Sequence, residues 1–410
     1  MSAAAMPDPI SDVPRDEPRA LRVGAPVADE RALADLAARS GLRRIHILAW
    51  RDLEDEEAGG SEVHAATVAR LWAEAGIEVT ARTSAVVGQP AIIERDGYRV
   101  IRRAGRHIVF PRAALAEVAR LHGPRDGLVE IWNGMPFLSP LWSRGPRVTW
   151  LHHVHDVMWD MVLPRPLAAA GKLLERRLAP PLYRRTPVIT LAESSRRELV
   201  DELGFHEDRV HVVAPGIDPR FRPGGERADH PLVVAVGRLV PVKRFDLLID
   251  ALVELKAEHP ALEGIIVGEG YERPGLEARI AAAGAGSWLH LPGHQTDDEV
   301  LDLYRRAWLV AGSSVREGWG MTITEAAACG TPAVASRIPG YVDAVVDGRT
   351  GLLVAPGELA PAIGLLLSDA GLRERLGEAA LQRARSFTWA RTALGTLQVL
   401  ADAGRRLPPG

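Results

Sequence analysis

Short apolar runs and segments of helical periodicity alternate along most of this chain. The first apolar run covers residues 44–50 (RIHILAW), which has the length and composition of a strand buried on both faces of a parallel sheet. Residues 62–75 follow with apolar side chains at helical spacing, and residues 77–83 return to strand character. This strand–helix–strand order predicts the start of a doubly wound sheet.

The alternation continues in two blocks of similar size. In the first block we predict further strands at 98–102, 128–132, 147–152, 187–191 and 210–214, with helices at 112–121, 166–177 and 195–203. In the second block we predict strands at 232–236, 264–267, 288–291, 308–311, 332–335 and 351–354, with helices at 245–258, 275–283, 297–306, 321–329 and 341–346. Residues 361–403 read as mostly helical. The predicted fold class is α/β, with two Rossmann-like doubly wound domains that face each other across a cleft.

Composition marks the limits of the two blocks. Residues 219–230 combine proline, glycine and charge, as linkers do. Residues 1–42 are rich in Ala, Pro, Asp and Arg, and we expect a flexible leader there with a short helix at 30–39. We therefore predict an N-terminal domain at 43–216 and a C-terminal domain at 217–386.

Charge and cysteine content exclude several classes of protein. The 410 residues carry a net charge of −3, so bulk charge gives no attraction to nucleic acid. A single cysteine excludes a disulfide framework and a cysteine-based zinc site. No apolar run is long enough to cross a bilayer, and the first residues lack the apolar core of a secretory signal. We expect a cytoplasmic protein.

The densest polar motif is the segment SSVREGWGMTITEAAACGTPAVAS at residues 313–336. Its glycines, Gly318 and Gly320, predict a tight turn, and a helix begins near Met321. Backbone amides at such a helix start, here those of Gly320, Met321 and Thr322, form an anion site. The segment therefore predicts a phosphate cradle.

Two carboxylates flank this cradle. Glu317 lies on the loop before the helix, and Glu325 lies inside the helix, eight positions later. A carboxylate can accept hydrogen bonds from two hydroxyls of a sugar, so the pair suits a nucleotide sugar. Either glutamate alone is also explained by the general preference of helix N-termini for acidic residues.

Two cations follow a predicted strand that ends at Gly237. Arg238 and Lys243 lie in the loop at the carboxyl end of this strand, where doubly wound sheets bind ligands. Together they would neutralise a diphosphate without a metal. A solvated basic loop explains Arg238 more simply in this arginine-rich chain, but only three of the 50 basic residues are lysines, and Lys243 is one of them.

The N-terminal block offers two weaker signals. Gly59 and Gly60 precede a helix and would let backbone approach a ligand closely, although Gly-Gly is also a common turn. His153 and His155 share one face of an extended segment, and a hydrogen-bonding role in the cleft suits either of them. No carboxylate or cysteine spacing completes a zinc site around them, so we predict no metal ligands.

The segment 165–185 is basic and rich in leucine. A basic amphipathic helix of this kind can contact anionic lipid. A solvated face is the explanation that the arginine-rich composition favours.

These motifs together resemble those of a known family. Glu317 and Glu325 in EGWGMTITEAAACGTPAVAS resemble the E-x7-E motif of the retaining glycosyltransferases of family 4, within the GT-B superfamily. Further segments resemble this family in its order: 59–62, 152–156, 188–199, 214–218, 234–252, 266–277 and 347–354. The resemblance covers roughly residues 44–400 and leaves out the leader.

The resemblance implies roles on both sides of the cleft. Gly60, beside Gly59, would lie against the donor phosphate. His155, rather than His153, would contact the donor sugar near the reacting carbon. Arg238 and Lys243, after Gly237, would bind the diphosphate and steady the leaving group.

The resemblance also implies a donor pocket around the glycine turn. Glu317 would hold the hydroxyls of the donor sugar, with the backbone of Trp319, Gly320, Met321 and Thr322 beside it. Glu325 would hold the nucleotide ribose. The loop at 294–295 would lie near the base. Trp319 stands where the family often has Phe, a change that we expect to reshape the sugar pocket. A C-terminal helix at 387–410 would return to the N-terminal domain.

The resemblance finally implies a reaction. It is the metal-independent, retaining transfer of a hexose from a nucleotide-diphospho sugar, with UDP or GDP as the nucleotide, by a front-face mechanism. No cofactor is obligatory, and no nucleic acid takes part. The acceptor is a small molecule or a lipid-linked hydroxyl, chosen by loops near 85–106 and 134–142, and 165–185 would contact the inner membrane face if it is lipid-linked. The alternatives are a GT-B-like phosphorylase, a nucleotide-sugar epimerase and a non-catalytic nucleotide-sugar binding protein.

Overall fold

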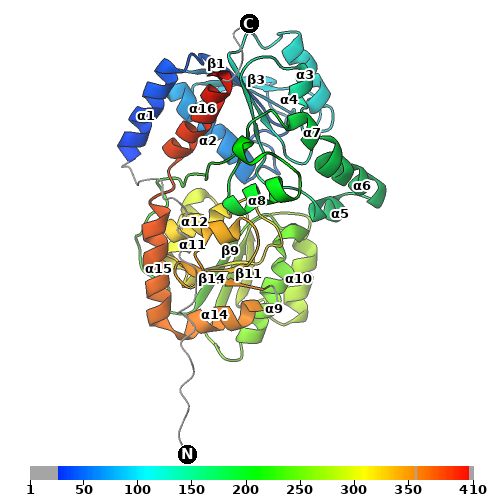
Figure 1. Cartoon of the computed structure of the whole chain (residues 1–410). Helices are drawn as coiled ribbons and strands as arrows, with labels where there is room; N and C mark the ends of the chain where they lie inside the picture. Colours follow the sequence, from blue (N-terminus) through cyan, green and yellow to red (C-terminus); the bar gives the residue numbers. More distant parts are fainter. Residues whose placement is uncertain (1–25, 356–357, 406–410) are drawn as a thin grey trace, which may run out of the picture.

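The computed structural model describes residues 26–355 and 358–405. Its elements form two lobes, each built around one sheet with helices packed on both sides (Figure 1). The upper lobe in this view contains the N-terminal half of the chain, and the lower lobe contains the C-terminal half. This is the two-domain α/β architecture that the alternating pattern predicted.

The N-terminal sheet has eight strands in the order β3-β4-β2-β1-β5-β6-β7-β8. Its strands are β1 (Arg44–Leu48), β2 (Glu78–Thr83), β3 (Ile92–Arg95), β4 (Tyr98–Arg102), β5 (Gly127–Ile131), β6 (Arg147–Trp150), β7 (Val188–Thr190) and β8 (Val210–Val212). All pairs are parallel except β3 with β4. The pattern analysis missed β3, which Asp96 and Gly97 join to β4; both have positive φ, the signature of a tight hairpin turn.

The C-terminal sheet has six parallel strands in the order β11-β10-β9-β12-β13-β14. These strands are β9 (Leu232–Val236), β10 (Glu263–Val267), β11 (Leu289–Gly293), β12 (Leu309–Gly312), β13 (Ala333–Ser336) and β14 (Gly351–Val354). The strand order changes direction at β9, the first strand of this domain: β10 and β11 lie on one side of it, and β12, β13 and β14 lie on the other. The loops after β9 and β12 therefore lie at the crevice where such sheets bind ligands.

Helices cover both sheets. In the N-terminal half they are α1 (Pro26–Arg39), α2 (Gly60–Glu74), α3 (Val109–Val118), α4 (Ser139–Trp142), α5 (Val157–Val162), α6 (Arg165–Leu173), α7 (Pro180–Tyr183) and α8 (Glu193–Asp201). In the C-terminal half they are α9 (Phe245–Leu255), α10 (Arg273–Ala282), α11 (Asp297–Arg306), α12 (Met321–Ala328), α13 (Tyr341–Ala344), α14 (Leu359–Ser368), α15 (Ala370–Ala384) and α16 (Trp389–Arg405). A π-helical turn (Leu174–Leu178) continues α6, so the helix predicted at 166–177 changes its winding before it ends.

The last helix returns to the N-terminal domain, as the resemblance implied. Helix α16 packs against α1, α2 and β6, and in Figure 1 the red α16 lies beside the blue α1. The indole Nε1 of Trp72 donates to the carbonyl oxygen of Ala393 at 3.0 Å. Leu397 and Leu400 are fully buried in the same core.

Part of the predicted leader is folded. Residues 26–39 form α1, in which Leu33, Leu36 and Ala37 are buried against α16. These side chains recur at helical spacing and complete the core of the N-terminal domain, so the expectation of flexibility was wrong for this part. Residues 1–25 of the predicted leader lie outside the described residues. Among the helices of the described ranges, none is long and apolar enough to span a membrane.

Candidate active site

The glycine turn between β12 and α12 forms as predicted. Gly320 precedes the first residue of α12 with φ 106°, and a Cβ at this position would lie 2.7 Å from the ring of Tyr341. Only glycine fits this conformation and this space. The amides of Met321 and Thr322 begin the helix, so they have no intrahelical acceptor and carry the positive end of the helix dipole.

Glu317 joins the turn to the loop after β9. Its Oε1 lies 2.6 Å from the Nζ of Lys243 and accepts a hydrogen bond of 2.7 Å from the Ser314 hydroxyl. The hydroxyl of Tyr341 lies 3.4 Å from the same oxygen. Lys243 ends the short turn Pro241–Lys243, and Ser313 Oγ donates to its carbonyl at 2.7 Å. The fold thus brings Lys243 and Glu317, which are 74 positions apart, into direct contact. The sequence analysis assigned both residues to the same ligand, the sugar nucleotide.

Glu325 lies on α12, where it faces α11. The hydroxyl of Tyr304 donates to its Oε2 at 3.3 Å. Burial raises the pKa of Glu325 to about 7, and the nearby carboxylates of Asp297 and Asp218 act in the same direction. This carboxyl is therefore poised between its neutral and its ionised form near neutral pH.

The Gly-Gly loop meets the C-terminal domain. A Cβ at Gly60 would lie 2.9 Å from the Sδ of Met321, and one at Gly59 would lie 3.7 Å from the Nε of Arg238. Arg238 follows β9, and its Nη1 donates to the carbonyl of Glu57 at 3.3 Å. Burial lowers the pKa of Arg238. The two glycines of the N-terminal domain thus lie opposite the predicted phosphate-binding groups. Gly237 packs against Lys243, whose Cε would be 3.3 Å from a Cβ there.

The histidine segment also reaches the domain interface. A Cβ at Gly318 would lie 2.9 Å from the carbonyl oxygen of His152 and 3.4 Å from the Nδ1 of His153. The rings of His153 and His155 stack with their centroids 5.0 Å apart. Burial lowers the pKa of His153 well below its usual value, so this ring is neutral. His153 lies at this interface and His155 stacks on it, and the preference for His155 stays a prediction.

Two further expectations concern the edges of the site. The loop at 294–295 follows β11, where Gln295 Nε2 donates to the carbonyl of His294 at 3.0 Å. The indole of Trp319 is 5% exposed and packs against Phe387 in an apolar cluster with Leu191. The ring is thus mostly enclosed by apolar neighbours, and its effect on a sugar pocket stays a prediction.

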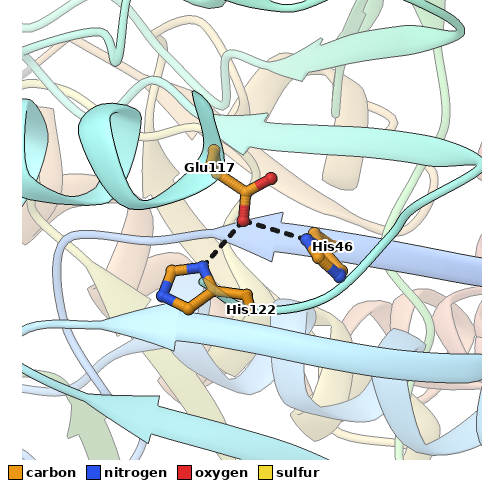
Figure 2. A group of neighbouring side chains, drawn as sticks. All are labelled: His46, Glu117 and His122. Atoms are coloured by element: carbon orange, nitrogen blue, oxygen red, sulfur yellow. Dashed lines mark hydrogen bonds and ion pairs between the residues drawn. The ribbon is translucent and has the colours of Figure 1, made fainter. Parts of the chain in front are cut away.

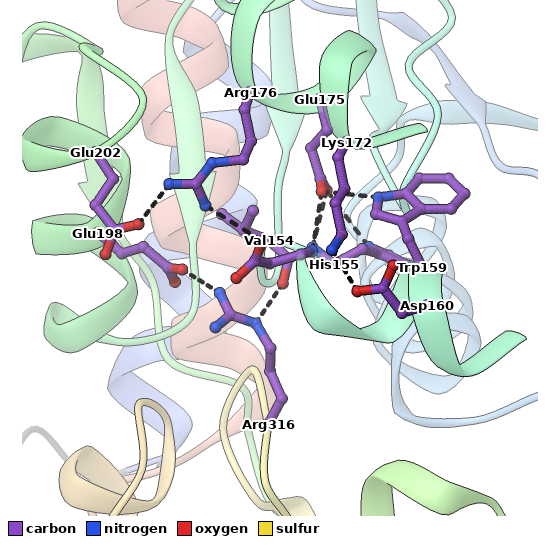
Figure 3. Close-up of polar contacts among 11 residues, drawn as sticks. Val154, His155, Trp159, Asp160, Lys172, Glu175, Arg176, Glu198, Glu202 and Arg316 are labelled. Carbon is purple, nitrogen blue, oxygen red and sulfur yellow. Dashed lines mark hydrogen bonds and ion pairs between the residues drawn. The ribbon is translucent and has the colours of Figure 1, made fainter. Parts of the chain in front are cut away.

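The sequence analysis missed the side chains that join the two domains. Arg316, directly before Glu317, donates from its Nε to the carbonyl of Val154 and from its Nη2 to Glu198 (Figure 3). In the first turn of α8, the amide and the hydroxyl of Ser194 donate hydrogen bonds to Asp343. Each partner comes from the other half of the chain, a relation that linear spacing does not reveal.

A second polar cluster lies inside the N-terminal domain. The Oε1 of Glu117 lies 2.9 Å from His46 Nδ1 and 2.8 Å from His122 Nδ1 (Figure 2). Its Oε2 lies 3.1 Å from Arg125 Nη1. Burial would raise the pKa of Glu117, but these partners lower it to about 2. Among the described residues this is the group with a metal-ligand composition. Arg125 already balances the charge of Glu117, so we interpret the cluster as a structural network within the core.

The comparisons with known proteins agree with this arrangement. The family described as Glycosyl transferases group 1 matches residues 217–383, and the one described as Glycosyltransferase Family 4 matches residues 58–221. A D-inositol 3-phosphate glycosyltransferase from Acidothermus cellulolyticus is 32% identical over 387 residues, which cover 85% of this chain and 86% of the relative. A protein of the same name from Nocardia farcinica is 38% identical over 236 residues, about half of each chain.

Solved structures share the fold. Sucrose-phosphate synthase from Thermosynechococcus elongatus superposes with a TM-score of 0.75 at 21% identity, over 87% of this chain and 98% of that one. Anabaena HepE in complex with UDP-glucose gives a TM-score of 0.68 at 20% identity, over 89% and 100%.

Two parallel-sheet domains of this kind define the GT-B class of glycosyltransferases. The chain belongs to glycosyltransferase family 4, and it is a glycosyltransferase.

Proposed function

We propose that the protein is a retaining glycosyltransferase that moves a hexose from a UDP sugar to a hydroxyl of a small phosphorylated acceptor. The observation that carries this proposal is the pairing of Lys243 with Glu317 at the start of α12, opposite Gly59 and Gly60. A cation, a carboxylate and free helix amides of the C-terminal domain thus lie opposite two glycines of the N-terminal domain. UDP-glucose in the structurally similar HepE supports the choice of donor.

The reaction follows from the charges around the donor site. The bond from the anomeric carbon to the diphosphate breaks through an oxocarbenium-like state, and negative charge builds on the leaving diphosphate. Arg238, Lys243 and the amides of Met321 and Thr322 stabilise this charge without a required metal ion. Glu317 holds hydroxyls of the sugar, and His155 lies near the reacting carbon. The acceptor hydroxyl attacks from the face that the diphosphate leaves, which retains the configuration, and its proton passes to the departing diphosphate as the glycosidic bond forms.

An anionic acceptor is supported by the names of the relatives, which are D-inositol 3-phosphate glycosyltransferases.

A lipid-linked acceptor is the second candidate, because the segment 165–185 exposes leucines beside arginines. Leu167, Leu173 and Leu178 are 57%, 52% and 56% exposed. The neighbouring basic side chains are also exposed: Arg165, Arg177, Arg184 and Arg185. Such a surface would bind anionic lipid at the inner membrane face. Sedimentation with vesicles that contain phosphatidylglycerol tests this contact, and equal recovery with neutral vesicles would exclude a role for charge.

Calorimetric binding of UDP, GDP, ADP and dTDP tests the donor site. We expect clear binding of UDP, weakened by about 1–3 kcal/mol in Glu325→Ala because the hydrogen bonds to the ribose are lost. Glu378→Ala is the matched control, since Glu378 contacts Gln382 on α15 and lies outside the site. Equal, feeble binding of all four nucleotides, unchanged by Glu325→Ala, would refute this placement of the donor.

Turnover assays separate the other functions. A phosphorylase would release sugar phosphate from a glycoside only with inorganic phosphate present, and an epimerase would convert the donor sugar without an acceptor. A protein that only binds nucleotide sugars would release no UDP. The proposed function requires UDP release that depends on D-inositol 3-phosphate or another acceptor.

A further inference from the structure

A fully buried carboxylate lies behind the histidine segment. Glu175, on the π-helical turn after α6, is 0% exposed. Its Oε1 accepts a hydrogen bond of 2.9 Å from the amide of His155, and its Oε2 accepts one of 3.1 Å from the amide of Asp156 and one of 3.0 Å from the indole of Trp159 (Figure 3). A buried charge with this many donors holds its neighbours in fixed positions.

These contacts keep Glu175 ionised. Burial alone would raise its pKa, but the hydrogen bonds and the nearby ring of His155 lower it below its usual value. The carboxylate therefore remains a hydrogen-bond acceptor at both oxygens at neutral pH.

The turn that Glu175 holds has an unusual backbone. Asp156 has φ 38° and ψ −107°, a conformation that a residue with a Cβ adopts only when its surroundings impose it. On the other side, Arg316 donates to the carbonyl of Val154. The turn therefore lies between the Glu175 carboxylate and the loop that carries Glu317, and Glu175 supplies the contacts from within the N-terminal domain.

The ring of His155 lies beside the same carboxylate. Its Nδ1 is buried, has no hydrogen-bond partner within the described residues, and lies 3.6 Å from Glu175 Oε1. The His155 side chain as a whole is 14% exposed. Because Nδ1 is buried, this exposure belongs to other atoms of the side chain. A carboxylate beside Nδ1 favours the tautomer with the proton on that nitrogen, which leaves Nε2 as an acceptor.

We infer that Glu175 is a positioning residue for glycosyl transfer, because it fixes the turn and the tautomer of His155 so that Nε2 is presented to the donor sugar. This inference rests on the proposed function, in which His155 contacts that sugar. Glu175 touches neither donor nor acceptor. Its loss is therefore expected to lower kcat and to leave nucleotide binding in the C-terminal domain intact.

The first measurement needs no variant. Nitrogen-15 NMR of the histidine rings, assigned with His155→Gln, reports which ring nitrogen of His155 carries the proton. We expect the proton on Nδ1 in the wild-type protein and a mixture of tautomers in Glu175→Gln. A proton on Nε2 in the wild-type protein would overturn the inference, whether or not the variant folds.

Kinetics supply the second measurement. Glu175→Gln should lower kcat by about 10- to 100-fold, the scale of a misplaced reacting group, and change the KM for the donor by less than about threefold. In a protein that already carries His155→Ala, Glu175→Gln should not lower kcat any further. Glu117→Gln is the matched control, since Glu117 is also enclosed in the same domain and, among the described residues, its hydrogen bonds and ion pairs go to His46, His122 and Arg125. This variant should lower the melting temperature but not kcat.

The outcomes separate this inference from the proposed function. If wild-type protein neither binds UDP nor transfers sugar, the proposed function fails while the tautomer of His155 is still measured. If wild-type protein transfers sugar and folded Glu175→Gln keeps its kcat, Glu175 is not a positioning residue.

Discussion

The Nζ of Lys243 lies 2.6 Å from the Oε1 of Glu317, so the cation assigned to the diphosphate and the carboxylate assigned to the sugar neutralise each other. Both side chains are mostly buried, with 19% and 15% exposed. A diphosphate that binds Lys243 would compete with Glu317 for the ammonium group. It would thereby free carboxylate oxygens for sugar hydroxyls, which couples the two halves of donor recognition.

We predict that Lys243→Ala lowers kcat by about 100-fold or more, because it removes a fixed charge aimed at the leaving diphosphate. The rate of UDP release during transfer measures this. Lys256→Ala is the control with the same change of charge, since Lys256 lies over the ring of Trp288 and donates to the carbonyl of Leu262. Equal rates for the two variants would show that Lys243 does not act on the leaving group.

Two glycines at the domain interface should respond differently to a methyl group. The new Cβ in Gly318→Ala would lie 2.9 Å from the backbone carbonyl of His152, which cannot move alone. We expect a loss of about 1–3 kcal/mol in unfolding free energy, as for other overpacked sites. In Gly60→Ala the Cβ meets the end of the flexible Met321 side chain.

Gly60→Ala should therefore keep its thermal stability and lose affinity for UDP, because the methyl group stands where the donor phosphate is expected. Thermal unfolding and UDP calorimetry on both variants check this contrast. A Gly60→Ala protein that binds UDP as tightly as the wild type would place the phosphate elsewhere.

The positions of most strands along the chain could be predicted from the sequence because buried parallel strands are short apolar runs bounded by loops. Strand β3 was missed because Ile92–Arg95 alternates apolar and charged residues on the sheet edge. Its Asp96–Gly97 turn was the available signal. Helix α1 was predicted only as a short helix in a flexible leader. Its alanines and leucines become buried only because α16, which is distant in the sequence, packs against them.

The candidate site was predicted where chemistry and local spacing coincide. Glu317, Gly320 and Lys243 lie in the loops that follow β12 and β9, and parallel strands bring the loops at their carboxyl ends together. Glu175 and Arg316 gave no such signal, because a glutamate in a basic helical segment and an arginine on a loop look solvated in the sequence. The partners of Glu175 lie 16 to 20 positions away, and those of Arg316 lie in the other domain, so only the tertiary structure reveals them.

Arg316 should hold the two domains together. Arg316→Ala removes the contacts to Val154 and Glu198 and leaves the latter carboxyl buried without its cation; burial already raises the pKa of Glu198. We expect a larger radius of gyration in X-ray scattering and a lower kcat. The control is Arg337→Ala, whose partner Asp347 lies in the same domain. Identical scattering curves for all three proteins would show that Arg316 does not control the domain arrangement.

Nucleotide affinity should depend on the ionisation of Glu325, whose pKa burial raises to about 7. Ribose hydroxyls donate hydrogen bonds and therefore favour the ionised carboxylate. UDP affinity should rise as pH increases from about 6 to 8, by up to about tenfold per pH unit below the pKa, because fewer molecules must first lose the proton. The same shift makes the folded protein hold a proton that the unfolded chain releases, so the contribution of Glu325 to stability falls between the ordinary pKa of 4.5 and about 7.

Calorimetry of UDP binding across this pH range, with Glu325→Gln beside the wild type, isolates the effect from the titration of UDP itself. The variant cannot ionise at this position, so it should show only the dependence that belongs to the nucleotide. The difference between the two curves of UDP affinity against pH then reports the ionisation of the Glu325 carboxyl alone. If the wild type and Glu325→Gln show the same dependence on pH, Glu325 does not contact the ribose, because a carboxylate that gains hydrogen bonds on binding must shift its titration.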